Sequence, residues 1–143
     1  MFWQVGGQGP ITGGCFGHFY AYAPDNAHQA RDYGLARYGM EAKRLLHVLE
    51  LHLTGKTYMV GEEYTIADMA IFPWVHQLRT GYINPGTKIK AADFLSVEES
   101  YPVLMAWCDR IHSRPAVQRG MTTCSWSAEN PKPWLAEEEE SKK

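Results

Sequence analysis

Apolar residues recur every three or four positions through the first half of the chain. The repeating positions are Leu35, Tyr38, Ala42, Leu45, Leu46, Leu49 and Leu53. This spacing places them on one side of an α-helix. Gly55 follows at the position where a left-handed residue commonly ends a helix. The pattern predicts a long amphipathic helix that starts after the turn at residues 24–26 and ends near Leu53.

A second helix is predicted to begin at Thr65. The Thr65 hydroxyl can accept a hydrogen bond from the helix, and the Asp68 carboxylate can reach back to the Thr65 amide, which makes a reciprocal capping box. Seven apolar residues follow, 69–75. A helix that is apolar on all sides is expected at the centre of a helical domain, and Pro73 is expected to kink it. We assign Thr65 and Asp68 to structure.

The rest of the chain predicts shorter helices. Residues 81–99 are typical of a loop with at most one helical turn, at 91–95. Pro102 is well placed to start a helix, because proline favours the first helical position, and Pro115 starts a shorter one that ends near Gly120. No segment alternates apolar and polar residues over a sustained length. The sequence therefore predicts an all-α domain of four to five helices.

The first 23 residues combine glycines with aromatic residues. Glycines in the stretch 6–10, together with Pro10, are expected to break any helix. The aromatic residues that follow (Phe16, His18, Phe19, Tyr20 and Tyr22) offer rigid contact area with polar tips. The mixture suits a loop or broken helix that lines a pocket, and it also suits a tightly packed corner.

Composition excludes several classes of protein. With 143 residues, 45% of them hydrophobic, the chain can bury a core as a single domain. The net charge of −2 equals the charge of residues 137–143, and no basic stripe is present, which argues against nucleic-acid binding. The apolar run at 69–75 is too short to cross a membrane. Three widely spaced cysteines favour a reduced, cytoplasmic protein.

The sequence lacks the common catalytic and metal-binding motifs. It has neither a Gly-x-Ser-x-Gly elbow nor a His-Glu-x-x-His pair, and His47 and His52 fall on different helix faces. We therefore expect no metal site and name no catalytic residue. Cys15 could be a reactive thiol near His18 or an inert cysteine.

Charged residues follow the outer face of the long helix. Arg37, Glu41 and Arg44 lie about one turn apart and can form ion pairs. Such a set is usually a solvated surface. The alternative is an arginine at the edge of a pocket, where its planar guanidinium can bind a carboxylate with two hydrogen bonds.

Several segments together resemble a known family. Residues 65–68, the apolar helix after them, Trp107 and residues 113–117 are similar to the C-terminal helical domain of glutathione transferases. Residues 2–7, 17–24 and 37–45 sharpen the likeness toward the nu class, which is linked to disulfide-bond reduction. The resemblance covers about residues 1–122 and implies a helical domain there, followed by an extended, partly disordered tail at 123–143. The family's thioredoxin-like domain has no counterpart in these residues.

The resemblance also implies a ligand, which is glutathione as substrate. In the nu class an arginine on the long helix reaches a glutathione carboxylate, and Arg37 occupies that position. The resemblance further suggests Gln4, His18, Phe19 and Tyr20 as residues that line the pocket, with Arg44 as a second positive group.

The expected function is that of a glutathione transferase C-terminal domain. Full-length relatives conjugate glutathione or use it to reduce disulfides, and this chain alone is expected to be weakly active or inactive. Its expected partners are glutathione and either a second copy, in a homodimer, or a thioredoxin-like domain. The alternative is a free-standing helical module for protein interaction or dimerisation that binds no ligand.

Overall fold

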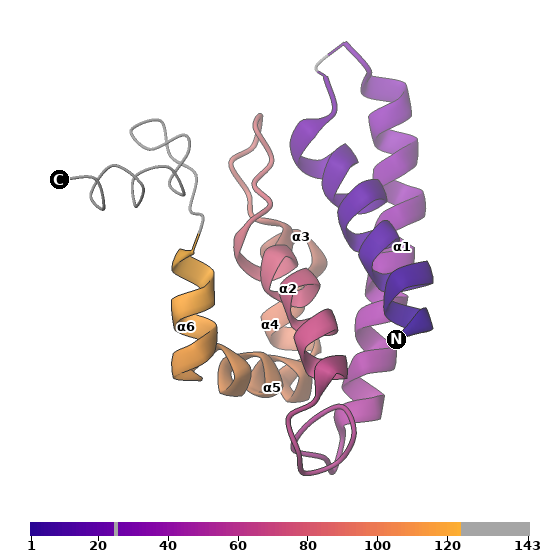
Figure 1. The fold of residues 1–143 in the computed structure, drawn as a ribbon. Helices are drawn as coiled ribbons and strands as arrows, with labels where there is room; N and C mark the ends of the chain where they lie inside the picture. The colour runs from indigo at the N-terminus through magenta and orange to yellow at the C-terminus, as the bar shows by residue number, and fades with distance from the viewer. Residues whose placement is uncertain (25, 124–143) are drawn as a thin grey trace, which may run out of the picture. The chain divides into compact units, whose positions relative to one another are not determined.

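The structure is a computed structural model, and it describes residues 1–24 and 26–123. The chain divides into two compact units, Met1–Asp109 and Arg110–Lys143, and each is described by itself. The helical segments, labelled in Figure 1, are η1 (Gln4–Gln8), η2 (Pro10–Tyr22), α1 (His28–Leu53), α2 (Ile66–Thr80), α3 (Ala91–Leu95), α4 (Val97–Ser100), α5 (Pro102–His112) and α6 (Pro115–Thr122).

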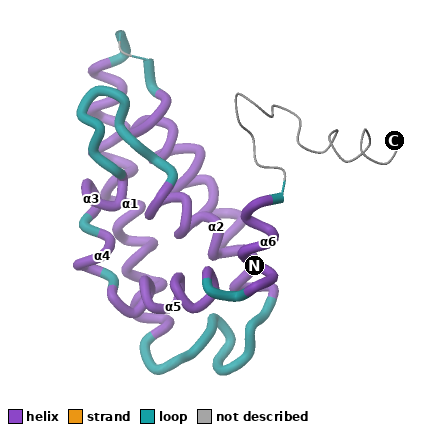
Figure 2. The backbone as a smooth tube through the Cα atoms, turned by 90° about the vertical axis from the view of Figure 1, so that its left-hand side faces the viewer, coloured by secondary structure: helices purple, strands orange, loops and turns teal. Residues whose placement is uncertain are grey.

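The all-α prediction is confirmed. Over the two described ranges the backbone forms helices and loops, with isolated bridges at Tyr58–Gly61 and Ile83–Lys90 but no strand (Figure 2). The helical segments outnumber the four or five expected for two reasons. One is that Ser96, with φ of 54°, divides residues 91–100 into two short helices, α3 and α4. The other is that the glycine-rich start of the chain is itself helical.

Helix α1 forms as its apolar pattern predicts. Five of the expected residues, Ala42, Leu45, Leu46, Leu49 and Leu53, are buried. The helix ends at Leu53, and Gly55 adopts the left-handed conformation with φ of 76°. The inner face of α1 therefore forms one wall of the core in the first unit.

The prediction that glycines break the helix at residues 6–10 is wrong. Residues Gln4–Gln8 and Pro10–Tyr22 form wide helical segments, and the Gly9 amide donates to the Gln4 carbonyl five residues earlier. The glycines allow close packing against neighbouring segments and do not interrupt the helix. A Cβ at Gly13 would overlap the Trp74 ring of α2, and one at Gly17 would lie 2.5 Å from the ring of Tyr82. Small residues let this segment approach α2 and the loop that follows it.

The capping box at the start of α2 is present and extends into a larger network. The Asp68 side chain is fully buried. One of its carboxylate oxygens accepts hydrogen bonds from the Met59 amide and the Trp107 indole, both 2.9 Å long. The other accepts from the Thr65 amide at 2.9 Å and the Thr65 hydroxyl at 3.1 Å, while the hydroxyl oxygen accepts from the Ala67 amide. Asp68 thus joins the loop before α2, α2 itself and α5.

Helix α2 is less enclosed than its composition predicts. Ile71, Phe72, Val75 and Leu78 are buried, as expected for a central helix. The first turn differs, because Ile66 and Met69 are more than half exposed within this chain. This turn lies at the surface beside η1 and the end of α1.

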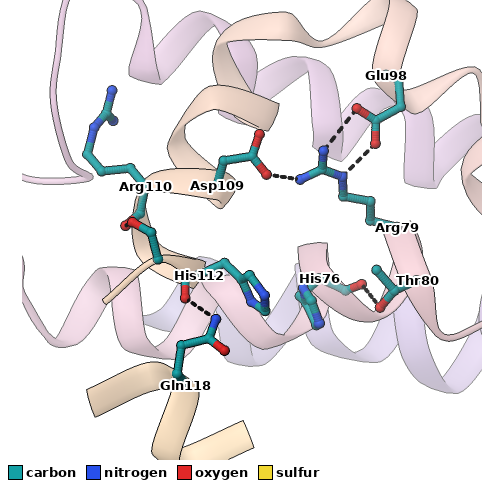
Figure 3. Close-up of polar contacts among 9 residues, drawn as sticks. His76, Arg79, Thr80, Glu98, Asp109, Arg110, His112 and Gln118 are labelled. Carbon is teal, nitrogen blue, oxygen red and sulfur yellow. Dashed lines mark hydrogen bonds and ion pairs between the residues drawn. The ribbon is translucent and has the colours of Figure 1, made fainter. Parts of the chain in front are cut away.

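The second unit contains the end of α5 and helix α6. The side-chain amide of Gln118 in α6 donates to the His112 carbonyl at 2.6 Å (Figure 3). Helix α6 starts at Pro115, as predicted, and runs two residues beyond Gly120. Residues 124–143 of the predicted tail lie outside the described residues, so the proposed boundary at 122 stays a prediction.

We expect Asp68→Asn to lower the free energy of unfolding by about 3 kcal/mol. The substitution removes the charge that strengthens four hydrogen bonds and sets an amide N–H against buried donors. Urea denaturation followed by circular dichroism measures the change. Asp32→Asn on the exposed side of α1 is the matched control and should stay within about 0.5 kcal/mol. Equal effects of the two substitutions would contradict the structural role of Asp68.

We also expect Gly13→Ala to destabilise the chain by about 2 kcal/mol, because the new methyl group overlaps the Trp74 ring and forces the helices apart. Gly14→Ala is the control. Its Cβ would meet no atom within 4 Å, so the gain in helix propensity should stabilise the chain by up to about 1 kcal/mol. Thermal unfolding of both variants measures whether Gly13→Ala lowers the stability and Gly14→Ala raises it. A stabilised Gly13→Ala variant would show that the two helices are not closely packed.

Candidate functional site

The pairing of η2 with α1 places several predicted site residues together. Phe19 stacks on Tyr38 with ring centroids 5.8 Å apart and planes 15° apart, and His18 meets the edge of Phe19 at 5.7 Å. The guanidinium carbon of Arg37 lies 5.8 Å from the centre of the Tyr38 ring. We call His18, Phe19, Tyr38 and Arg37 the aromatic–arginine cluster.

Gly34 makes this cluster possible. A Cβ at this position would lie 2.5 Å from the Phe19 ring, so only glycine leaves room for Phe19 against α1. Leu35, at the next position, is half-buried. The cluster is therefore fixed by packing between η2 and α1, with Arg37 and His18 on its exposed side.

Arg37 is exposed, and its guanidinium forms no hydrogen bond or ion pair with residues 1–24 and 26–123 beyond its contact with Tyr38. A cation over an aromatic ring at an exposed site contributes about 0.5–1 kcal/mol. That contact is not a hydrogen bond, so it leaves the N–H groups of the guanidinium available. The side chain can therefore bind an anionic group without first breaking an ion pair.

Arg44 differs from Arg37 in being paired. Its Nε donates to both carboxylate oxygens of Glu41, at 3.1 and 3.0 Å, and its Nη2 donates at 2.6 Å. The pKa of Glu41 lies below its usual value, mainly because of the Arg44 hydrogen bond, with a smaller contribution from the Arg37 charge. Arg44 adds positive potential near the cluster, but its Nε and Nη2 groups already donate to Glu41.

Tyr20 points away from the cluster and into the core. Its side chain is 2% exposed, and its hydroxyl donates to the carbonyls of Ile89 and Lys90, at 3.1 and 3.3 Å. Burial and, to a smaller extent, Asp93 raise the pKa of this hydroxyl above its usual value. The structure therefore gives Tyr20 a role in holding the loop between α2 and α3 against η2.

Gln4 lies at the opposite end of the helix pair. It is 9% exposed and lines a hollow with Leu49, His52 and residues at the start of α2. Leu49 is twelve positions beyond Arg37 on α1, which corresponds to about 18 Å along the helix. The structure therefore groups Arg37 with His18 and Phe19, and it separates Gln4 from them.

A cluster of ion pairs around Arg79 was not predicted from the sequence. This guanidinium donates to both carboxylate oxygens of Glu98, at 2.5 and 3.1 Å, and also to Asp109 (Figure 3). These hydrogen bonds raise the pKa of Arg79 above its usual value. The partners are 19 and 30 residues away in sequence, so no local spacing indicates the contact. The three charged groups pair with one another, which favours a structural role.

Two further properties limit the chemistry of the described residues. Among them, no three His, Cys, Asp or Glu side chains converge as a metal site would require. Cys108 is buried, and burial raises its thiol pKa to about 11, so it is not a reactive thiolate near neutral pH. In the same part of the chain, no helix has the length and apolar character needed to cross a membrane.

Comparison with known proteins adds sequence relatives. The chain is 44% identical over 120 residues to the disulfide-bond oxidoreductase YghU of Escherichia coli (strain K12). The aligned region covers 84% of this chain and 38% of that protein. It is 36% identical over 121 residues to YfcG, a disulfide-bond oxidoreductase of the same organism, with 85% and 48% covered. The chain thus spans less than half the length of these two relatives.

Solved structures of similar fold are glutathione transferases. One, from Burkholderia graminis, has two glutathione molecules bound per subunit; its TM-score is 0.75 at 34% identity, with 87% of this chain and 48% of that chain covered. Another, the glutathione transferase YghU of Streptococcus pneumoniae in complex with glutathione, has a TM-score of 0.72 at 41% identity, with 88% and 44% covered.

The family model described as "Glutathione S-transferase, C-terminal domain" matches residues 18–115, which include the Phe19–Tyr38 stack, the Asp68 network and helix α5. This match, together with the helical fold and the relatives above, shows that the chain belongs to the glutathione S-transferase C-terminal domain family.

Proposed function

We propose that this chain is the helical part of a glutathione-dependent disulfide reductase or transferase, and that Arg37 binds a carboxylate of glutathione. The observation that carries the proposal is the exposed Arg37 guanidinium, which has no ion-pair partner among the described residues and lies beside a fixed aromatic surface. Similar proteins solved with glutathione bound, such as the Streptococcus pneumoniae transferase, support glutathione as the ligand.

The geometry of arginine suits this ligand. Glutathione carries two carboxylates, and a guanidinium can donate two parallel hydrogen bonds to one of them. Stacking on Tyr38 limits the motion of the Arg37 side chain, which lowers the entropy lost on binding. Phe19, stacked on Tyr38, supplies an aromatic wall next to it, and the His18 ring stands nearly perpendicular to that of Phe19. Arg44 adds positive potential, while Tyr20 supports the fold behind the site.

Positive charge near glutathione would also favour its reactive form. A cation stabilises the thiolate over the thiol and so lowers the thiol pKa. The thiolate can then attack one sulfur of a disulfide, which forms a mixed disulfide and releases the other sulfur as a thiolate. Among the residues that the structure describes we identify a group for the carboxylate but none for the cysteinyl sulfur. We therefore propose that the chain alone is weakly active or inactive.

The partners of the chain belong to the same proposal. Exposed apolar side chains at the start of α2, Ile66 and Met69, favour a further protein surface there, either a second copy or a thioredoxin-like domain. Cys15 and Cys108 are free, which suits a reducing compartment such as the cytoplasm. A free-standing interaction module is the alternative, and it requires no ligand at Arg37.

Calorimetric titration with glutathione distinguishes the two functions. We expect the wild-type chain to bind glutathione and Arg37→Ala to bind it at least fivefold more weakly, a loss of about 1 kcal/mol. Lys56→Ala removes the same charge beyond the far end of α1 and should change the affinity less than twofold. Absence of binding by the wild type would favour the interaction module. Equal weakening by both variants would show that Arg37 acts only through net charge.

Turnover of the isolated chain tests the proposed lack of activity. With glutathione and a small organic disulfide such as hydroxyethyl disulfide, we expect a rate close to that of the uncatalysed exchange. The reason is that, within residues 1–24 and 26–123, we identify no group that holds the cysteinyl sulfur. Release of oxidised glutathione is measured with glutathione reductase and NADPH. A rate comparable with that of an intact transferase would contradict the proposal.

A further inference from the structure

We propose that the loop between α2 and α3 is a protein-binding surface, and that its partner is an extended, acidic segment of another protein. The loop spans residues 81–90 and extends beyond the ends of both helices (Figure 1). It offers an unpaired backbone edge at Ile83, together with two exposed lysines, Lys88 and Lys90. A protein that adds a peptide strand to an exposed edge binds it through main-chain hydrogen bonds and selects it by its side chains.

The backbone of the loop forms a minimal two-stranded ladder. Ile83 and Lys90 face each other as an isolated antiparallel bridge. Hydrogen bonds flank this pair on both sides, from the Asn84 amide to the Ile89 carbonyl at 3.0 Å and from the Ala91 amide to the Tyr82 carbonyl at 2.8 Å. In a pair flanked in this way, the N–H and C=O groups of the two facing residues point to the two outer edges of the ladder.

The two edges differ in what covers them. At the Lys90 edge, the Tyr20 hydroxyl donates to the Lys90 carbonyl at 3.3 Å, so η2 covers that edge. At the other edge, the N–H and C=O of Ile83 form no hydrogen bond with residues 1–24 and 26–123. An extended peptide laid along the Ile83 edge can accept a hydrogen bond from this N–H and donate one to this C=O.

The side chains of the loop define the chemistry of the partner. Residues 81–90 contain two lysines and no acidic residue, which gives this stretch a charge of +2 in a chain whose net charge is −2. Lys88 and Lys90 are exposed and form no ion pair within the described part of the chain. Ile83 and Ile89 are each 47% exposed and offer apolar contacts beside the lysines. A segment that alternates acidic and apolar residues complements both features.

Hydrogen bonds fix the loop before any partner arrives. Oδ1 of Asn84 accepts from the amides of Gly86 and Thr87, at 3.0 and 2.9 Å, and its Nδ2 donates to the Tyr20 carbonyl at 3.3 Å. Lys88 is held in the left-handed conformation, with φ of 62°, which is uncommon for a residue other than glycine. A loop that is already ordered loses little conformational entropy when it binds.

This surface is separate from the site proposed for glutathione. The loop contains no member of the aromatic–arginine cluster, so the inference does not depend on the role of Arg37. Its failure would leave the proposed glutathione site unchanged, and the reverse also holds.

NMR titration of the isotope-labelled chain with the acetylated and amidated peptide Glu-Val-Glu-Val-Glu tests the proposal. We expect saturable shifts at the Ile83 amide and at the methyl groups of Ile83 and Ile89. The peptide with lysine in place of each glutamate should bind at least tenfold more weakly, because like charges repel. The acidic peptide with all its backbone amides methylated should bind at least fivefold more weakly, because it cannot donate to the Ile83 carbonyl.

Variants of the chain locate the binding surface. Lys90→Glu should weaken binding of the acidic peptide at least fivefold, because repulsion replaces attraction. Lys56→Glu, which makes the same charge change in the loop after α1, is the matched control and should change the affinity less than twofold. Ile83→Pro removes an N–H that is unpaired in the described chain and should weaken binding at least threefold. Circular dichroism confirms that each variant is folded, and the methylated peptide carries the backbone test if Ile83→Pro fails to fold.

Four results would overturn the proposal. The first is no saturable shift at Ile83 or Ile89 with the acidic peptide. The second is equal weakening by Lys90→Glu and Lys56→Glu, or equal binding of the methylated peptide, since either excludes strand addition at a basic edge. The third is a shift of these methyl groups by phosphatidylserine vesicles but not by the peptide, which would assign the loop to an anionic membrane. The last is a shift that depends on the concentration of the chain alone, which would assign it to a second copy.

Discussion

A buried carboxylate that has no cationic partner in the described part of the chain holds the first unit together. Asp68 is fully buried, and four donors on three residues satisfy its two oxygens. Hydrogen bonds to a charged acceptor are stronger than neutral ones, and a negative charge in the first turn of a helix also interacts favourably with the helix dipole. One side chain therefore fixes the loop after α1, the start of α2 and the indole of Trp107.

Close packing against α2 and the loop after it also fixes the position of η2, near the start of the chain. Trp74 and Tyr82 occupy the space that side chains at Gly13 and Gly17 would need. Gln8 adds a hydrogen bond from its side-chain amide to the Ile71 carbonyl of α2, at 3.3 Å. η2 packs against α2 on one side and against α1 on the other, where Gly34 leaves room for the Phe19 ring. The aromatic–arginine cluster is thus a consequence of glycine positions in two helices.

The sequence allowed accurate prediction where the signal is local. Each correct prediction depends on neighbours within one or two turns. This holds for the apolar stripe of α1, the capping box of Thr65 and Asp68, and the helix starts at Pro102 and Pro115. The prediction for the glycine-rich start of the chain failed because local propensity opposes a helix there, while the stabilising contacts come from residues about 60 positions away. Close approach to a distant ring cannot be distinguished from a turn by composition alone.

The same distinction applies to the candidate sites. The family resemblance selected Arg37, His18 and Phe19, which the structure brings together, but it could not separate them from Gln4 and Tyr20, whose surroundings depend on α2 and the loop after it. The arginines show why surroundings matter. Arg44 and Arg79 already bind carboxylates of this chain, so an anionic ligand would have to compete with Glu41, Glu98 or Asp109.

Arg37 involves no such competition, because its interaction with Tyr38 is with the ring face and leaves the N–H groups open. An arginine of this kind is suited to bind a carboxylate that arrives from outside the chain.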